Sequence, residues 1–469
     1  MLFDSPVYIL FLILIVIVYW RLDFRKQNLF LLVASYFFYG WWDWRFLLLM
    51  IGSTAIDYLV AREIYLAQVS RSRRMWLLFS LIVNFSILGI FKYCNFFIDS
   101  FAQALHLLGA NGIPRHVLQI VLPPGISFYT FQEVAYIADI YKGKLKPADS
   151  FIQYSLFISL FPHLIAGPIQ RPSHLLPQVQ APRVWKSEKV FDGLMLIMEG
   201  LFRKCVIADN CALIANAAFE GHFGPPTLPV LLLGMYAFAW QIYGDFSGYS
   251  SIARGSAQLL GFHFMVNFRQ PYLAETLQDF WRRWHISLST WLRDYLYIGL
   301  GGNRNGKVQT FRNLMLTMLL GGLWHGANWT FVIWGGIHGT GLAAGRMAPH
   351  HEPSANRTPA WIWIRRVIVF HVACVAWLFF RAATPRAAFA MLNGIGVWLW
   401  RPEFLVAFQF LAVFSLPLLL VDLMLDKSGD EYIFQTRPFP ARVAIGVASA
   451  AVILLFGANQ ANAFIYFQF

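Results

Sequence analysis

A histidine lies within an apolar stretch of the sequence, where a titratable side chain is costly. His325 is preceded by the apolar run Leu319–Trp324 and followed shortly by Phe331–Trp334. An ionisable group in such a stretch faces protein or a water-filled cavity and is a functional-site hypothesis by default. Asn328 follows His325 by three residues and would share its helical face. Its side-chain amide could there orient the imidazole or bind an oxygen. A hydrogen-bonded structural histidine between helices is the alternative.

A second histidine, His285, lies in segment 279–297, which is too polar to span a membrane. Trp281, Trp284 or His285, and Leu288 recur at helical spacing and predict one face of an amphipathic helix. The aromatic residues of this segment suit a membrane interface. An interfacial helix explains the periodicity without any chemical role for His285.

Positive charge is concentrated between residues 254 and 312. This segment holds eight Lys or Arg and three acidic residues, a net charge of +5. It would attract lipid headgroups or an anionic donor that carries phosphates, and Arg282, Arg283 and Arg304 are candidates for binding that donor. Glycines predict a loop over Ile298–Lys307, but the GxxxxGK[ST] order of a nucleotide-binding loop is missing.

The other titratable residues in apolar surroundings have plainer explanations. His338 and His371 are interpreted as structural histidines, and Asp245 as a helix cap or buried partner. His163 adjoins Pro162 and is a candidate for lining a cavity. The scattered histidines and cysteines predict no metal site, and no GxSxG sequence indicates a hydrolase.

Composition indicates what must position these residues. The chain of 469 residues is 58% hydrophobic and only 13% charged, whereas globular domains are about a quarter charged. Its apolar residues come in blocks of about 15 to 20, the length that crosses a bilayer, and predict roughly 11 to 13 membrane helices. The clearest blocks are Val7–Trp20, Leu29–Trp41, Phe46–Val60, Trp76–Phe91, Phe151–Ile165, Pro229–Ile242, Val367–Phe380, Leu405–Val421 and Val443–Phe456.

The distribution of basic residues predicts an orientation. The first apolar block is preceded by Asp4 and by no Lys or Arg, which argues against a cleaved signal peptide. Basic clusters recur in three later loops, and each loop is separated from the next by an even number of predicted crossings, so all three should lie on the same side of the membrane. Their residues are Arg21, Arg25, Lys26, Arg62, Arg71, Arg73, Arg74, Lys142, Lys144 and Lys146. The N-terminus is therefore expected outside the cytoplasm. The net charge of +13 is attributed to loops against anionic lipids, not to nucleic acid.

The chain is expected to form one integral membrane domain over residues 1–469. Proline and glycine interrupt its centre, and broken backbone at membrane depth survives only where protein or a water-filled cavity satisfies it. The centre is therefore predicted to hold re-entrant or tilted helices around a cavity. The predicted parts are N-terminal helices in 1–116 with a polar connection over 92–116, a catalytic core in 117–345, and C-terminal helices in 346–469 after a polar loop at Met347–Pro359.

Several separated motifs resemble the membrane-bound O-acyltransferase family, most closely its bacterial alginate O-acetyltransferase branch. They occur in the expected order along nearly the whole chain. The motifs are Pro124–Tyr129, Phe161–Pro168, Asp245–Ser250, Trp284–Ser289 with Trp291–Tyr295, Gly299–Arg304, Gly322–Trp329 and the closing Phe464–Phe467.

The resemblance implies an all-α fold, in which a ring of tilted membrane helices, with re-entrant and interfacial helices, surrounds a tunnel through a thin partition. His325 corresponds to the family's invariant histidine and is expected to act as the general base. His285 corresponds to its second characteristic histidine. Trp324, Asn328, Asp294 and Arg293 are expected to support the site or line the tunnel.

The resemblance also implies a reaction. An acetyl group would pass from a cytoplasmic donor, acetyl-CoA, with no bound cofactor, across the bacterial inner membrane for O-acetylation of an exopolysaccharide such as alginate or cellulose. The expected partners are an extracytoplasmic SGNH-type acetyltransferase, a polysaccharide synthase or secretion complex, and membrane lipids. Transfer of D-alanine to teichoic acid, acetylation of peptidoglycan, a transporter without bond chemistry and a scaffold for a synthase are the alternatives.

Overall fold

The computed structural model describes residues 1–109, 118, 120–165, 167–347, 358–434, 437–458 and 465. Within these residues the regular structure is entirely helical, so the predicted all-α class is confirmed. The chain divides into two compact units, Met1–Val190 with Ser256–Phe264 and Phe191–Gly255 with Met265–Phe469. The predicted divisions near residues 116 and 345 stay predictions. The ring, the tunnel and the single-domain assignment stay predictions.

Five helices are long and apolar enough to cross a membrane, counting only the described residues. They are Trp44–Leu66, the continuous stretch Ser70–Leu107, Pro359–Arg381, Pro402–Ser428 and Phe439–Phe456. These helices make the chain a polytopic membrane protein. The predicted total of 11 to 13 spans is not tested, because other apolar blocks lie in shorter or more polar helices.

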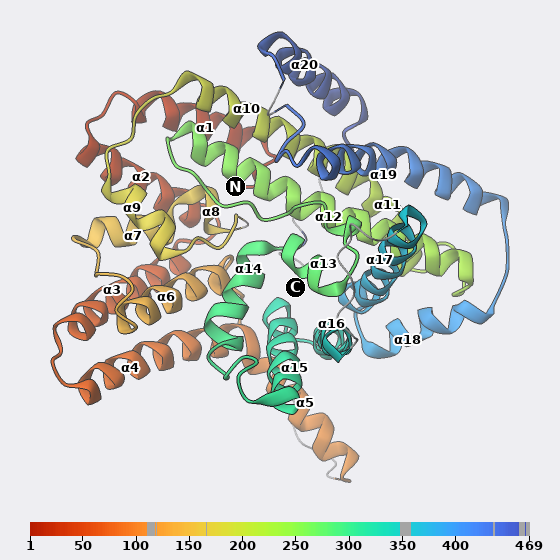
Figure 1. Cartoon of the computed structure of the whole chain (residues 1–469), viewed down its shortest axis with the longest axis horizontal. Helices are drawn as coiled ribbons and strands as arrows, with labels where there is room; N and C mark the ends of the chain where they lie inside the picture. The colour runs from red at the N-terminus through yellow and green to blue at the C-terminus, as the bar shows by residue number, and fades with distance from the viewer. Residues whose placement is uncertain are drawn as a thin grey trace. The chain divides into compact units, whose positions relative to one another are not determined.

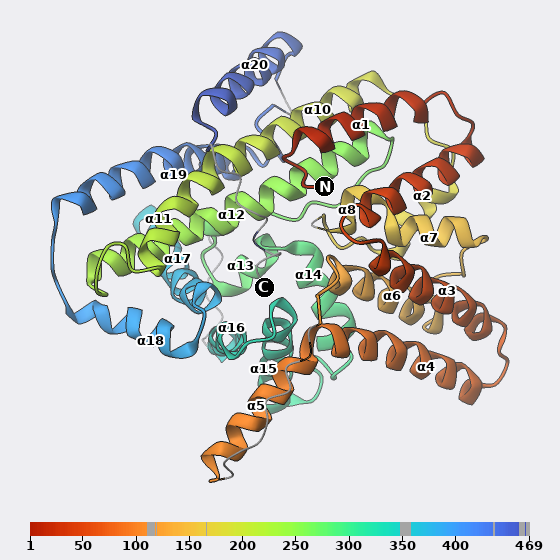
Figure 2. The ribbon, with the colours of Figure 1, turned by 180° about the vertical axis from the view of Figure 1, so that it is seen from behind.

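The first unit is a set of helices around α3, α4 and α6, which pack side by side (Figures 1 and 2). Its elements are α1 (Pro6–Tyr19), α2 (Phe24–Gly40), α3 (Trp44–Leu66), α4 (Ser70–Leu88), η1 (Gly89–Tyr93), α5 (Cys94–Leu107), α6 (Ile126–Tyr141), α7 (Phe151–Ser159), α8 (Phe161–Leu164), α9 (Pro172–Gln180) and the start of α10 (Ser187–Leu201).

Two predictions for this unit have clear outcomes. The polar connection expected over 92–116 is wrong for 94–107, where apolar side chains such as Phe97 and Phe101 continue the helix of α4 as α5. Residues 110–117 of that connection lie outside the described residues. The block Phe151–Ile165, expected as one apolar helix, is divided, because α7 ends at Ser159 and α8 begins at Phe161 beside the interrupting Pro162.

The second unit holds both principal histidines. Its elements are the rest of α10, η2 (Phe202–Ala208), α11 (Asp209–Phe219), α12 (Leu228–Leu259, continuing into the first unit), η3 (Pro271–Leu273), α13 (Leu277–Arg283), α14 (Ile286–Trp291), η4 (Leu292–Tyr297), α15 (Gly306–His325), α16 (Trp329–Met347), α17 (Pro359–Arg381), α18 (Pro385–Asn393), η6 (Gly394–Gly396), α19 (Pro402–Ser428) and α20 (Phe439–Phe456). Residues 348–357 of the predicted polar loop and most of the closing motif Phe464–Phe467 lie outside the described residues.

Glycines bring α15 and α16 into close contact (Figure 1). A Cβ atom on Gly322 would lie 2.2 Å from the carbonyl oxygen of Phe331, and one on Gly335 would lie 2.2 Å from that of Met318. Small residues at a membrane helix interface let two backbones approach in this way. The close pairing fixes the position of His325, the last residue of α15.

Candidate active site

His325 lies in an aromatic enclosure at the end of α15. Its side chain is 3% exposed, and its ring lies 5.0 Å from Trp324, 5.0 Å from Trp334 and 5.3 Å from Phe380, measured between ring centroids. The helix ends here because Gly326 takes an extended conformation and starts the turn to α16. The expectation of a buried histidine is confirmed.

The structure places Asn328 differently from the prediction. Asn328 lies in the turn between α15 and α16, so the expected shared helical face with His325 is wrong, because α15 ends at His325. Its side-chain amide donates to the carbonyl of Ala383 at 2.9 Å, and its carbonyl oxygen accepts from the backbone N–H of Thr330 at 3.0 Å. Asn328 therefore fastens the turn that follows the histidine.

The helix predicted through His285 is broken at that residue. His285 has φ +43°, and it separates α13 from α14. A left-handed backbone is uncommon for a residue with a side chain and persists where neighbouring contacts hold it. The backbone N–H of Ile286 supplies one such contact by donating to the carbonyl of Asn267 at 2.9 Å. The predicted continuous face from Trp281 to Leu288 is therefore wrong.

Asn267 also fixes the protonation of the His285 ring. The side-chain oxygen of Asn267 accepts from the backbone N–H of Ser287 at 3.1 Å, so this oxygen faces the histidine. The Nδ1 atom of His285 lies 3.2 Å from the same oxygen and must be the donor, because an amide oxygen has no hydrogen. A neutral imidazole then carries no hydrogen on Nε2. That nitrogen is buried, and no described residue forms a hydrogen bond with it.

Burial keeps His285 neutral. The side chain is fully buried, and this loss of hydration lowers its pKa to about 3. His285 thus presents an unprotonated base nitrogen at neutral pH. Its ring packs 6.3 Å from Trp324, which in turn lies 5.0 Å from His325. One indole therefore contacts both histidines, and the supporting role of Trp324 stays a prediction.

A third histidine, His338 of α16, belongs to the same aromatic cluster, although its sequence context suggested only a structural role. Its ring lies 4.8 Å from Trp334, which also contacts His325. The indole N–H of Trp281 donates to Nδ1 of His338 at 3.3 Å. Nε2 must then carry the hydrogen, and it is buried without a hydrogen-bond partner among the described residues. No sequence signal marks this orientation, because Trp281 and His338 are 57 positions apart.

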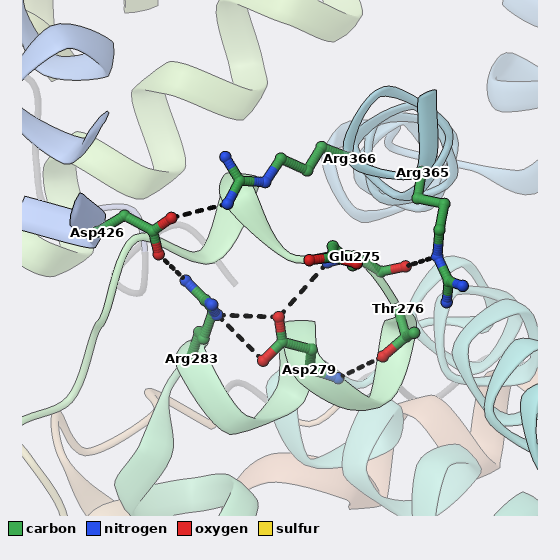
Figure 3. Close-up of polar contacts among 7 residues, drawn as sticks. All are labelled: Glu275, Thr276, Asp279, Arg283, Arg365, Arg366 and Asp426. Atoms are coloured by element: carbon green, nitrogen blue, oxygen red, sulfur yellow. Dashed lines mark hydrogen bonds and ion pairs between the residues drawn. The ribbon is translucent and has the colours of Figure 1, made fainter. Parts of the chain in front are cut away.

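The predicted donor-binding arginines do not share one environment. Arg283 forms ion pairs with Asp279 at 3.0 Å and with Asp426 at 2.7 Å (Figure 3). Asp426 also pairs with Arg366 at 2.8 Å, so these charges link α13 to α17 and α19. Arg282 and Arg304 are exposed and form no ion pair with a described residue. They stay candidates for binding an anion, whereas Arg283 is already neutralised.

Arg293 and Asp294, predicted to support the site, form an ion pair with each other at 2.7 Å on η4. Their side chains are 61% and 36% exposed, so this pair lies at the surface of the unit. Asp245 of α12 is confirmed as a buried partner, because its carboxylate lies 3.0 Å from the ammonium of Lys204. The described residues contain no group of three or more His, Cys, Asp or Glu side chains that could hold a metal ion.

Two further histidines are fully engaged and provide a contrast. Nε2 of His163 lies 3.1 Å from the carbonyl of Phe157, and Nδ1 lies 3.2 Å from the amide of Gln132. His371 has both nitrogens within 2.8 Å of partners, the Tyr236 hydroxyl and the Val367 carbonyl. The structural interpretation of His371 is confirmed, and His163 has no nitrogen left to serve a cavity.

The chain thus combines membrane-crossing helices with buried imidazoles, and one of these imidazoles has a bare nitrogen. Comparison with known proteins identifies the class. The model of the membrane-bound O-acyltransferase family matches residues 148–389, which include all three histidines of the aromatic cluster. The chain belongs to this family, and it is an O-acyltransferase.

Relatives with assigned names extend over most of the chain. A probable alginate O-acetylase of Pseudomonas aeruginosa is 43% identical over 85% of this chain and 76% of its own length. A probable alginate O-acetylase of Azotobacter vinelandii is 39% identical, and the match covers all of both chains. A peptidoglycan O-acetyltransferase of Helicobacter pylori is 37% identical over 84% of this chain and 80% of its own.

Proposed function

We propose that this protein transfers acetyl groups from a cytoplasmic thioester donor, acetyl-CoA, for the O-acetylation of an exopolysaccharide, with alginate as the first candidate. The contact of Trp324 with both His285 and His325 carries the proposal. This contact brings two buried imidazoles together inside the segment that matches the family. The names of the alginate O-acetylase relatives support the polymer.

The proposed mechanism starts with neutral His325 as the general base. Its imidazole takes the proton of the acceptor hydroxyl while the hydroxyl oxygen forms a bond to the thioester carbonyl carbon. The C–S bond then breaks, and the departing sulfur takes the proton from the imidazolium. An ester and a free thiol are the products, and His325 returns to its neutral form.

The other two histidines supply complementary polar groups. The bare Nε2 of His285 accepts a hydrogen bond from a second, non-reacting hydroxyl of the acceptor, and this bond orients the reacting hydroxyl toward His325 and the carbonyl. The N–H at Nε2 of His338 donates to an oxygen of the acyl donor. Each of these nitrogens is buried without a partner among the described residues, which favours a bound substrate as the missing partner.

The location and the partners follow from the same proposal. The protein lies in the bacterial inner membrane with its N-terminus outside the cytoplasm, so that donor and acceptor approach from opposite sides. An extracytoplasmic SGNH-type acetyltransferase receives the acetyl group and passes it to the polymer made by a synthase or secretion complex. Peptidoglycan is the second candidate acceptor, favoured by the relative from Helicobacter pylori.

Replacement of His325 by Ala tests the proposal. The purified variant, reconstituted in vesicles with labelled acetyl-CoA, the extracytoplasmic acetyltransferase partner and a mannuronate oligosaccharide, should lose thiol release and ester formation by about 10²–10⁴-fold, the usual contribution of a general base. His222→Ala removes an imidazole that is 68% exposed and should leave both rates unchanged.

The same pair of variants separates transfer from transport. A transporter would move labelled acetyl-CoA without releasing thiol in any variant. Ester formation at the normal rate by His325→Ala, in protein that is inserted at the normal level, would exclude His325 as the base. Esters formed on a peptidoglycan fragment but not on mannuronate would replace alginate as the acceptor.

A further inference from the structure

A cavity of about 600 Å³ lies in the first unit, at the turn between α3 and α4. Three basic side chains line it, those of Arg73, Lys144 and Lys146. None of the three forms an ion pair with a described residue. Arg71 and Arg74 lie near the same end of α4, so positive charge gathers around this cavity.

The Arg73 side chain is fixed by contacts with Tyr141, and one of its N–H groups has no partner among the described residues. Its guanidinium donates to the carbonyl of Tyr141 at 2.8 Å and lies 5.6 Å from the Tyr141 ring centroid. The Nε atom is buried and has no hydrogen-bond partner among the described residues. A guanidinium fixed at one end with an unused N–H suits an oxygen-rich anion, because it loses little freedom on binding.

The backbone adds positive potential to the same cavity. Helix α4 begins at Ser70, which lines the cavity, and Val69 before it provides no side-chain cap. The first N–H groups of a helix carry a partial positive charge, so arginines in this turn are unfavourable unless an anion is present. The start of α4 and the basic side chains therefore both favour the binding of an anion.

The surroundings of the cavity distinguish a lipid from a soluble anion. Tyr65 lines it and is 52% exposed, and Leu66 and Val69, which adjoin lining residues in the sequence, are 61% and 64% exposed. The helices on either side of this turn are two of those that can cross a membrane. The turn between two adjacent spans lies where phospholipid headgroups lie, with acyl chains against the apolar residues beside it.

We propose that this cavity binds the phosphate of an anionic phospholipid headgroup, with Arg73, Lys144 and Lys146 as its ligands and the lipid tails along the exposed face of Tyr65 and Leu66. The bound phosphate supplies the ion-pair partner that Arg73, Lys144 and Lys146 do not find among the described residues. The site is independent of the transfer reaction, because it belongs to the first unit and uses none of the histidines of the aromatic cluster.

Native mass spectrometry of the full-length protein in detergent tests this proposal with phosphatidylglycerol as the probe. A basic residue near a lipid surface contributes about 1 kcal/mol, so Lys144→Gln with Lys146→Gln should weaken retention about 30-fold. Arg21→Gln with Arg25→Gln removes the same charge from exposed positions of the same unit and should retain the lipid. Lys144 and Lys146 are exposed, so their replacement leaves packing intact, and Arg73→Gln provides a second loss-of-binding variant.

Two further probes identify the source of the phosphate. Phosphatidylcholine, which has the phosphate but no net charge, should be retained more weakly and without dependence on the two lysines. Equal loss of phosphatidylglycerol in both double variants would overturn the site. Lysine-dependent binding of CoA or inorganic phosphate, with no such dependence for phosphatidylglycerol, would overturn the lipid and assign the cavity to a soluble anion.

Discussion

His285 and His338 have the same residue type and the same complete burial, yet their rings present opposite groups. Asn267 accepts from Nδ1 of His285, which leaves Nε2 bare and able only to accept. Trp281 donates to Nδ1 of His338, which puts the hydrogen on Nε2 and leaves it able only to donate. The partner of one ring nitrogen thus decides the chemistry of the other.

This difference shows how one cluster can hold an acceptor and a donor without any charged group. Both unused nitrogens lie in surroundings where an unmatched polar atom costs about 1–3 kcal/mol. A substrate that offers a hydroxyl to one and an oxygen to the other would recover that cost. The contrast with His163 and His371 is instructive, because both nitrogens of those rings already have partners.

Within this comparison, the largest effect should come from removal of His285, the histidine that accepts a hydrogen bond. His285→Ala is expected to lower ester formation about 10²-fold or more, since the hydroxyl loses its orientation beside His325. His338→Ala should cost only about tenfold, the contribution of one neutral hydrogen bond. Rates with acetyl-CoA, the extracytoplasmic acetyltransferase partner and a mannuronate oligosaccharide, at matched protein levels, measure both losses. Equal losses in the two variants would remove the distinction between the histidines.

Asn267→Asp should change the pH dependence through His285. The pKa of His285 is about 3, so the ring stays neutral and active as an acceptor at every pH above about 4. A carboxylate at hydrogen-bonding distance raises such a pKa by about 1 to 3 units, and protonation then blocks Nε2. The activity of the variant relative to the parent should therefore fall as pH falls from about 6 to 4.

Asn267→Ala provides the control for this prediction. It removes the oxygen that orients His285 but adds no charge, so the rate should fall at all pH values without a new acidic limb. A purely structural role for Asn267 would give the same profile for both variants. The ¹⁵N chemical shifts of the imidazole nitrogens would report the protonation of the ring directly. They should show Nδ1–H for His285 in the parent, where the side chain of Asn267 accepts its hydrogen bond, but not in Asn267→Ala.

The sequence predicted part of this site and missed the rest for identifiable reasons. Burial of His325 follows from its apolar neighbours, and the broken centre follows from its prolines and glycines. The break at His285 was missed because helical spacing continues from Trp281 to Leu288. What stops the helix is Asn267, a residue 18 positions away whose contact exists only after folding.

The first unit illustrates the same limit. Its basic loops could be located from the sequence, and they predicted membrane lipids as partners. That Arg73, Lys144 and Lys146 share one cavity depends on the packing of α4 against α6, which no local pattern encodes. Local periodicity thus indicates which residues are buried or basic, whereas pairing between distant segments decides what each one can do.

The smallest effect should come from Trp281→Phe, which keeps the aromatic packing but removes the N–H that donates to His338. The imidazole hydrogen is then free to occupy either nitrogen, so the donor at Nε2 is present only part of the time. Ester formation should fall about two- to fivefold, within the range of one weakened hydrogen bond.

A double-mutant comparison decides whether this loss acts through His338. In the His338→Ala background the Trp281→Phe substitution should cost nothing more, because the ring that it orients is gone. In the His285→Ala background its effect should add to the existing loss, since the two rings use separate partners. A Trp281 effect of unchanged size in the absence of His338 would mean that the indole acts by packing alone, and the donor assigned to His338 would lose its support.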